Sequence, residues 1–291
     1  MPFSLPSFAK INLQLRVLGK RDEYFHEIFT VLQTVSLHDT LSFEKAENEI
    51  EILSEDPNVP TDETNLIVQA AEHIRSKFRI KSGATIRLEK RIPSPGGLGG
   101  GSSNAAVALI ALSRLWELDI SESELIEIAA SLGSDVPFFL FGGTAVGTGT
   151  GSTISPTDDL NLGPTLIVSP KVQVSTKEAY AGLNANRLTS GEAESILSNY
   201  RFGAIDGLKC VNDFEKTVFA AFPEIEFVKQ TLLELGANAA SMSGSGASVF
   251  GIFDNEETRQ TALKALGEKA NWRSFAVAAV SRNEYRERLG M

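Results

Sequence analysis

The sequence predicts an α+β protein, because helical and strand-like segments alternate along the chain without a regular βαβ period. The strand-like segments alternate polar and apolar residues, which is typical of strands that bury one face. The helical segments carry apolar residues three and four positions apart, and two of them begin at serines suited to capping a helix. The 291 residues are enough for one large domain or two ordinary ones.

The first half of the chain opens with a predicted strand over 10–17. Because alternate side chains of a strand point to opposite faces, Lys10 and Asn12 should project together from its polar face. A capping box at 121–124 begins a helix that Gly133 is placed to end. The other elements predicted here are strands over 28–43 and 84–92 and helices over 65–78 and from about 102 to 118.

A change of composition after Pro137 indicates where the first half ends. The stretch FFLFGGTAVGTGTG predicts a hairpin followed by a flexible crossing, so we place a domain boundary near 151–156, between domains 1–155 and 156–291. In the second half, the spacing predicts strands over 165–168, 241–253 and 274–280 and helices over 177–183, 225–235 and 256–266.

Composition narrows the class of function. A net charge of −10 leaves no basic footprint for nucleic acid, but it is compatible with phosphorylated small molecules. No segment is apolar and long enough to cross a membrane, no secretory signal pattern is present, and a single cysteine permits no disulfide within the chain. We therefore expect a cytoplasmic protein without a membrane partner. The three histidines and the cysteine lack metal-ligand spacing, and no feature fixes an oligomeric state.

The stretch PSPGGLGGGSSNAA stands between a predicted strand and a predicted helix. Glycine is costly to order, so five glycines within six residues indicate a backbone that approaches something closely. A helix N-terminus offers unpaired amides to an anion, which makes this loop a candidate phosphate site. It is neither a P-loop, since no Gly-Lys-Ser/Thr follows, nor a complete dinucleotide fingerprint. The alternative is a flexible linker, against which the ordered flanks argue.

Phosphoryl transfer also needs a group that orients or deprotonates the acceptor hydroxyl, and a carboxylate is the usual one. Asp135 is the candidate, because it lies in a tight segment between Gly133 and Pro137 among apolar neighbours. Lys10 could supply the cation that keeps such a carboxylate ionised. For Asp135, a turn-forming role fits the local sequence as well as a catalytic one does. For Lys10, a position on a solvated strand face fits the local sequence better than a functional role does.

Two further features have both a functional and a structural interpretation. His26, in EYFHEIF, could hydrogen-bond a base or a hydroxyl while Phe25 stacks beside it, although a structural pair of histidine and aromatic ring fits the local sequence better. The cluster Ser243–Gly246 could be a second close-approach loop near the phosphates, or a plain bulge or turn in a strand.

Four motifs in chain order, FAKINL, GLGGGSSNAA, SDVPFF and MSGSGASVF, resemble those of the GHMP kinase superfamily. With FHE added, they are most similar to the branch that phosphorylates a cytidine-diphosphate sugar alcohol in non-mevalonate isoprenoid biosynthesis. The resemblance runs from about Phe8 to Phe250. It implies a two-domain GHMP kinase fold with the active site in the interdomain cleft. It also implies transfer from ATP, with Mg²⁺, to the 2-hydroxyl of that small-molecule substrate.

The resemblance implies a role for each candidate residue. Asp135 would take the acceptor proton, Lys10 would hold Asp135 and the hydroxyl in place, and Asn12 would contact the substrate beside them. The residues implied to bind cytosine are Phe25, His26 and Tyr180. Those implied to bind ATP are Asn65 and Leu66 at the adenosine and Pro95, Gly96, Gly97, Leu98, Gly99, Gly100, Gly101, Ser102 and Ser103 at the phosphates.

The chain departs from the family pattern at two positions. Phe25 replaces the tyrosine that usually precedes the histidine, which keeps a stacking ring but removes a hydroxyl, and Pro95 stiffens the entry to the loop. No acidic Mg²⁺ ligand is evident. The ion would be held mostly by ATP oxygens and water, with Ser102 or Ser103 as possible contributors.

Three rival functions remain open on sequence. A homoserine or mevalonate-type kinase would share the loop but would not need the predicted cytosine pocket of His26 and Tyr180. A nucleotide-binding sensor would keep the loop but would need neither Lys10 nor Asp135. A structural or interaction protein would leave two glycine clusters between ordered elements without a purpose.

Overall fold

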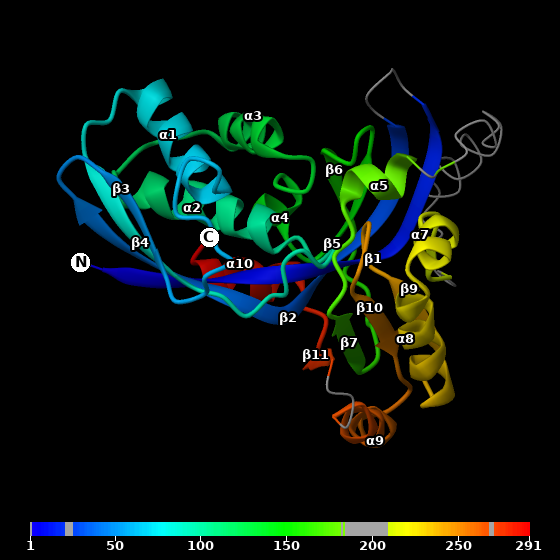
Figure 1. The fold of residues 1–291 in the computed structure, drawn as a ribbon. Helices are drawn as coiled ribbons and strands as arrows, with labels where there is room; N and C mark the ends of the chain where they lie inside the picture. Colours follow the sequence, from blue (N-terminus) through cyan, green and yellow to red (C-terminus); the bar gives the residue numbers. More distant parts are fainter. Residues whose placement is uncertain (1, 21–25, 182, 184–208, 268–270) are drawn as a thin grey trace.

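The computed structural model describes residues 2–20, 26–181, 183, 209–267 and 271–291 (Figure 1). Its strands form two sheets, most of whose neighbours are antiparallel, and helices pack on both, which confirms the α+β class. The larger sheet runs β3-β4-β2-β1-β8, with β5 on β2 and β6 on β5. The smaller sheet runs β11-β7-β10-β9. Within the described ranges, no helix is both long and apolar enough to span a membrane.

The strands of the larger sheet come mainly from the first half of the chain. They are β1 (Phe3–Lys20), β2 (His26–Ala46), β3 (Ile50–Ser54), β4 (Gly83–Glu89), β5 (Thr144–Thr148), β6 (Thr153–Pro156) and β8 (Val211–Asn212). Figure 1 shows that β1 and β2 extend from the helix-covered end of the molecule to α5 and α7. Their antiparallel register shifts between Asn12 and Gln14, as at a β-bulge.

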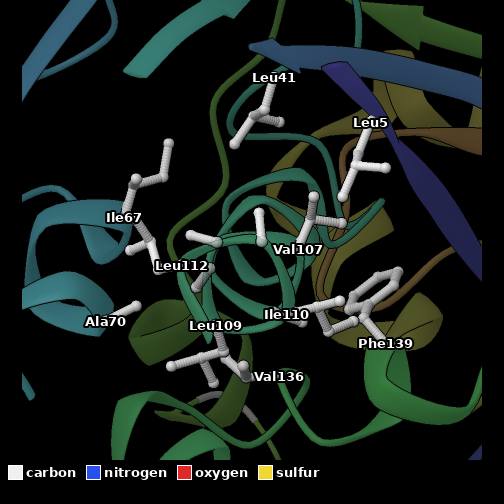
Figure 2. Close-up of a cluster of buried hydrophobic side chains, with 14 of the residues drawn as sticks. Leu5, Leu41, Ile67, Ala70, Val107, Leu109, Ile110, Leu112, Val136 and Phe139 are labelled. Atoms are coloured by element: carbon white, nitrogen blue, oxygen red, sulfur yellow. The ribbon is translucent and has the colours of Figure 1, made fainter. Parts of the chain in front are cut away.

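The helices on this sheet enclose the first core. They are α1 (Leu66–Phe78), α2 (Gly100–Leu115), α3 (Glu122–Leu132), α4 (Phe138–Phe141) and α10 (Arg282–Leu289). Every α2 residue from Ser103 to Ser113 is buried, because the helix lies between the sheet and the other helices. Figure 2 shows its Val107, Leu109 and Leu112 in a cluster that Leu5 of β1 and Ile67 of α1 complete.

The smaller sheet comes from the second half of the chain. Its strands are β7 (Thr165–Pro170), β9 (Ala239–Met242), β10 (Val249–Ile252) and β11 (Trp272–Val277). The helices of this half are α5 (Thr176–Ala181), α7 (Glu215–Ala221), α8 (Pro223–Glu234) and α9 (Glu256–Leu266). Its core joins α8 residues such as Val228 and Leu232 to the sheet residues Leu166 and Val249.

Most predicted elements are present, and several gain a structural reason. Asn65 caps α1 by accepting from the Ile67 amide at 2.9 Å. The capping box at Ser121 is present, and Gly133 follows the last residue of α3. The predicted strand over 84–92 ends at Glu89, because the next residues turn toward the glycine loop.

Two predictions are wrong. The single strand over 241–253 is a hairpin of β9 and β10, because Gly244 and Gly246 take positive φ angles and turn the chain. The FFLF segment is the helical turn α4 instead of a hairpin strand, and the hairpin that follows consists of β5 and β6. Short apolar runs do not separate strand from helix by periodicity.

The prediction missed β3, β6, β8, α7 and α10. The last of these places Tyr285 and Leu289 in the first core, although it ends the chain. The division at 155/156 remains a prediction. Two segments of the second half belong with the first: β8 is a strand of the larger sheet, and α10 packs in the first core.

Candidate active site

A cleft of about 550 Å³ is lined by residues from both halves of the chain. The first half contributes β1, the glycine loop and the turn before α4, and the second half contributes α5 and the turn between β9 and β10. The predicted site residues in its lining are Lys10, Asn12, His26, Leu66, Pro95, Gly96, Gly97, Leu98, Gly99, Gly100, Gly101, Ser102, Asp135 and Tyr180. The fold therefore gathers most of the candidates at one place.

The glycine loop packs so closely that two of its glycines cannot be replaced without strain. Gly97 has a φ of +71°, and a Cβ there would lie 2.0 Å from the Ser243 carbonyl oxygen. Gly99 has a φ of +70°, and a Cβ there would lie 2.8 Å from the Phe139 ring. Both positions need glycine because a side chain would meet both steric and conformational penalties.

The loop ends at the N-terminus of α2, which has no side-chain cap. Gly99 precedes the helix, and its carbonyl accepts from the Ser103 amide at 2.8 Å. A Cβ at Gly101 would meet only the Leu66 side chain, at 3.9 Å, so this part of the loop is open. An uncapped helix start at an open, glycine-lined wall is suited to bind an anionic group.

The two serines at the start of α2 have different surroundings. Ser102 is half-buried and lines the cleft. The Ser103 hydroxyl is fully buried and accepts a hydrogen bond from Ser7 at 2.8 Å, so this side chain does not reach the cleft. The spacing of the serines could not distinguish them, because their exposure depends on how α2 packs against β1.

Lys10 and Asp135 meet in the cleft. Lys10 is buried, with only 2% of its surface exposed. Its ammonium lies 3.3 Å from an Asp135 carboxylate oxygen and donates to the Asn12 side-chain oxygen at 2.6 Å. The Asp135 side chain is 39% exposed, so one partner is buried and the other faces the cleft. A carboxylate that faces the cleft next to a buried ammonium can accept a hydrogen bond from a hydroxyl.

Asn12 has a supporting network of its own. Its side-chain amide donates to the Thr30 hydroxyl at 2.8 Å, and that hydroxyl donates to the Gln14 carbonyl at 2.7 Å. Its backbone amide donates to the Ser243 hydroxyl at 3.2 Å. These bonds fix the side-chain oxygen toward Lys10, so Asn12 orients the ammonium.

The second glycine cluster faces the first. The Ser243 hydroxyl donates to the Gly97 carbonyl at 2.9 Å, and the Ser248 amide donates to the Gly96 carbonyl at 3.2 Å. Buried Asn212 holds this turn from β8, because its side-chain amide donates to the carbonyls of Met242 and Gly244, each at 2.7 Å. The cluster is therefore a turn between β9 and β10 that also packs closely on the first glycine cluster, and its place beside bound phosphates remains a prediction.

Aromatic rings form the far wall of the cleft. The His26 and Tyr180 rings are stacked, with centroids 4.9 Å apart and planes at 28°. Phe214 packs edge-on against Tyr180 at 4.7 Å. Burial, and to a lesser degree the Asp135 charge, raises the pKa of Tyr180, so its phenol stays neutral at physiological pH. Phe25 lies outside the described residues.

A side cavity of about 270 Å³ adjoins the cleft and shares Leu66, Ser94 and Gly101 with it. Asn65 lines this side cavity instead of the main cleft, and its side chain donates to the Pro60 carbonyl at 2.6 Å. The remaining lining residues are Asp56, Asn58, Val59, Pro60, Thr64, Leu88, Lys90, Arg91, Ile92, Asn104 and Arg273.

A buried ion pair supports the side cavity, and sequence reasoning missed it. Lys90 donates to the Asp39 carboxylate at 2.7 Å and to the Ile92 carbonyl at 2.7 Å. Asp39 also accepts from the backbone amide of Ile92 at 2.8 Å. Burial lowers the pKa of Lys90, and Asp39 opposes that shift. The two residues are 51 positions apart, so no local pattern could have paired them.

The described side chains include no cluster of three His, Cys, Asp or Glu residues that could hold a metal ion. The oxygen donors that line the cleft include the Ser102 hydroxyl in the first turn of α2 and the Asp135 carboxylate. Such a set suits a hard cation that arrives with its own phosphate and water ligands, as Mg²⁺ does.

Comparisons with known proteins agree with this geometry. The family model described as GHMP kinases N terminal domain matches residues 65–143, and the one described as GHMP kinases C terminal matches 194–271. A 4-diphosphocytidyl-2-C-methyl-D-erythritol kinase from Syntrophus aciditrophicus is 39% identical over 276 residues, covering 94% of this chain and 97% of the relative. One from Thermodesulfovibrio yellowstonii is 40% identical, covering 89% and 92%.

Solved structures give the same result. A crystal structure of 4-(cytidine 5'-diphospho)-2C-methyl-D-erythritol kinase is similar, with a TM-score of 0.77, 31% identity, and coverage of 95% of this chain and 99% of that one. A homoserine kinase from Cytophaga hutchinsonii has a TM-score of 0.71 at 21% identity, covering 97% and 96%. At that identity the second likeness supports the fold alone.

Proposed function

The chain belongs to the 4-diphosphocytidyl-2-C-methyl-D-erythritol kinase family of the GHMP kinases, and from this we propose how its cleft transfers a phosphoryl group. The motif resemblance and the predicted GHMP kinase fold are confirmed. The protein is a small-molecule kinase that uses ATP to phosphorylate 4-diphosphocytidyl-2-C-methyl-D-erythritol in isoprenoid precursor biosynthesis. The acceptor atom, the residue roles and Mg²⁺ are parts of the proposal.

The contact between Lys10 and Asp135 carries the mechanism. The Asp135 carboxylate accepts the proton of the 2-hydroxyl, whose oxygen then attacks the γ-phosphorus of ATP as ADP leaves. Lys10, 3.3 Å from that carboxylate, stabilises negative charge at the attacking oxygen. Asn12 fixes the Lys10 ammonium through their 2.6 Å hydrogen bond and lies where the substrate passes.

The glycine loop holds the donor. The loop from Gly97 to Ser102 lines the cleft and presents backbone amides to the ATP phosphates, and the uncapped start of α2 adds its dipole. The side cavity next to it takes the adenosine, with Asn65 and Leu66 in its lining. The shared residues Leu66 and Gly101 support one continuous path from nucleoside to phosphates.

Mg²⁺ fits as an ion carried by the nucleotide. Ser102 is the side chain in this chain best placed to hold it, since the Ser103 hydroxyl is buried against Ser7. When bound, the ion neutralises charge on the phosphate oxygens during transfer. The protein groups supply position, and Asp135 supplies the proton acceptor.

The aromatic wall binds the cytosine. His26 and Tyr180 lie at one end of the cleft, and the ring of Phe214 supports Tyr180. His26 donates to or accepts from the base edge, and the base stacks on Tyr180. Phe25 would supply the second stacking surface. The distance between this wall and Asp135 is spanned by the diphosphate of the acceptor.

ADP release tests the assignment and the base together. With Mg-ATP, we expect turnover with 4-diphosphocytidyl-2-C-methyl-D-erythritol and none with homoserine or mevalonate. Asp135→Asn should lower kcat by about 10²–10⁴-fold, the usual contribution of a positioned proton acceptor. Asp158→Asn, a change of the same chemistry at an exposed residue outside the cleft lining, should leave kcat unchanged.

The other outcomes discriminate among the rivals. Turnover with homoserine or mevalonate alone would contradict the cytosine-binding role of His26 and Tyr180 but would agree with the assignment as a kinase. ADP binding without turnover of any acceptor would favour a nucleotide sensor. An Asp135→Asn variant as active as the native protein would assign the proton to another acceptor.

A further inference from the structure

Arg273 occupies a distinctive position, where the second half of the chain reaches the side cavity. It lies on β11 and pairs with Ser169 of β7 in the smaller sheet. It lines both the side cavity and an outer groove of about 510 Å³, which Lys171 also lines. The side cavity is otherwise lined by residues of the first half.

The Arg273 guanidinium is held in place on two sides. One of its terminal nitrogens donates to the Arg91 carbonyl at 3.2 Å. The guanidinium carbon also lies 5.2 Å from the centroid of the Phe275 ring, within the range of a cation–π contact. A fixed guanidinium loses less entropy when it binds a ligand than a freely moving side chain does.

The charge of Arg273 is available, whereas that of Lys90 in the same cavity is balanced. Lys90 is paired with Asp39 at 2.7 Å, and both side chains are buried. No ion pair of Arg273 is found among the residues that the structure describes. Asp56 lines the same cavity, and its pKa is lowered chiefly by hydrogen bonds from Asn58, with Lys90 and Arg273 as smaller causes.

The position of the cavity identifies the part of the ligand that Arg273 faces. Gly101 and Leu66 line both the side cavity and the part of the cleft that faces the glycine loop. If the phosphates lie along the glycine loop, the nucleoside attached to them occupies the side cavity. Apolar side chains such as Leu88 and Ile92 provide a surface for a base. A planar guanidinium can stack on a base and donate to ribose hydroxyls.

We propose that Arg273 is a nucleotide-binding residue that contacts the base and ribose of the phosphate donor from the second domain. The inference rests on the proposed placement of adenosine in the side cavity. Arg273 belongs to the smaller sheet, whereas the other residues of the side cavity belong to the first half of the chain. Both halves of the chain would then contribute to nucleotide binding. Arg273 acts in donor affinity and has no part in the proton transfer at Asp135.

Binding of ADP by calorimetry tests the proposal without any acceptor. Arg273→Ala should weaken ADP binding about tenfold, the effect of one lost charge-assisted contact. Inorganic tripolyphosphate, which has no nucleoside, should bind the native protein and the variant equally. Arg273→Lys should recover only part of the ADP affinity, because an ammonium neither stacks nor donates as a fork. Lys171→Ala is the matched control, since it removes the same charge from the outer groove alone.

Kinetics give a second readout that a merely structural role would not produce. In Arg273→Ala, the KM for ATP should rise about tenfold, while kcat and the KM for the acceptor stay within twofold. Unchanged ADP affinity, or an equal loss of ADP and tripolyphosphate binding, would overturn the proposal. An equal effect of Lys171→Ala would attribute the loss to general charge and overturn it as well. If the acceptor proves to be another compound, the ADP measurement still decides the role of Arg273.

Discussion

Single residues at the site derive their properties from the environment that the fold builds around them. Lys10 is almost fully buried, yet its ammonium has both a carboxylate at 3.3 Å and an amide oxygen at 2.6 Å. In the proposed mechanism, these two contacts hold the ammonium beside the acceptor oxygen, where negative charge develops.

Tyr180 should act through its ring instead of its hydroxyl. Burial raises the pKa of Tyr180, so the phenol is neutral throughout the working pH range and Tyr180→Phe keeps the stacking surface. We expect Tyr180→Phe to change the acceptor KM by less than twofold and Tyr180→Ala to raise it about tenfold. Steady-state kinetics with each substrate varied would check this. A matching rise in the KM for ATP would contradict a role confined to the acceptor.

Cys210 should be unreactive at neutral pH. Burial raises its pKa to about 11, with Lys229 opposing the shift and Glu215 adding to it. At pH 8 the thiolate fraction is then about 100-fold below that of a thiol with the ordinary pKa of 9.0. Alkylation of the native protein by iodoacetamide should be slower by this factor than alkylation of the unfolded chain, and it should accelerate up to pH 11.

The same pKa shift has a consequence for stability. Because the folded pKa of Cys210 lies above the unfolded value of 9.0, its contribution is complete below pH 9 and is lost as the pH rises through about 11. The free energies of unfolding of the native protein and of Cys210→Ala should therefore depend differently on pH only between pH 9 and about 11. A difference between them that varies at pH 5–8 would assign the dependence to other groups.

At the scale of an element, the glycine loop joins a strand to the buried helix α2 and packs against the turn after β9. Its glycines are not equivalent. Gly97 has a positive φ and no room for a side chain, whereas Gly101 lies within the helix start and faces open space. The loop is thus closely packed at Ser243 and open at Gly101, where we propose that the phosphates bind.

This contrast predicts opposite effects on stability. Gly97→Ala should lower the free energy of unfolding by about 1–3 kcal/mol, because the methyl group would meet the Ser243 carbonyl in a strained backbone. Gly101→Ala should leave that free energy unchanged or raise it by up to about 1 kcal/mol, as expected for alanine in a helix. Urea unfolding of both variants provides the comparison. Equal losses would mean that the loop is not held as the contacts indicate.

At the scale of the whole molecule, the ends of the chain stabilise regions far from them in sequence. The segment after β11 continues into α10, which returns to the first core. Tyr285 there is completely buried, packs against Phe8 with centroids 5.6 Å apart, and donates from its hydroxyl to the Phe139 carbonyl at 2.5 Å. The α4 turn, three residues after Asp135, is therefore supported by the C-terminal helix.

Loss of this contact should destabilise the first core. Tyr285→Ala should cost about 3–5 kcal/mol for the cavity it leaves, and Tyr285→Phe about 1–3 kcal/mol for the unpaired Phe139 carbonyl. With Trp272→Phe as background, Trp116 in the first core becomes the single tryptophan and reports this core alone. A denaturation midpoint of Trp116 that Tyr285→Ala does not move would show that α10 is dispensable for that core.

The chain's local patterns determined most of the elements and the type of site. Apolar spacing located β1, α1 and α9, capping residues located the start of α3, and the order of motifs indicated a kinase with Lys10, Asp135 and the glycine loop. These features could be predicted because helix and strand periods and capping preferences act within a few residues. The periodicity gave a wrong prediction at FFLF, because a short apolar run fits a strand and a helix equally well.

Only the tertiary structure decided which of these residues meet. Asp39 and Lys90, Asn212 and the turn at Gly244, and Arg273 and the side cavity are brought together across 30 or more positions. The same packing buried the Ser103 hydroxyl and left Ser102 in the cleft. The physical reason is that burial and pairing are set by contacts between elements, which no period along the chain encodes. The sequence by itself determined what chemistry this protein performs, and the fold decided which side chains are placed to perform it.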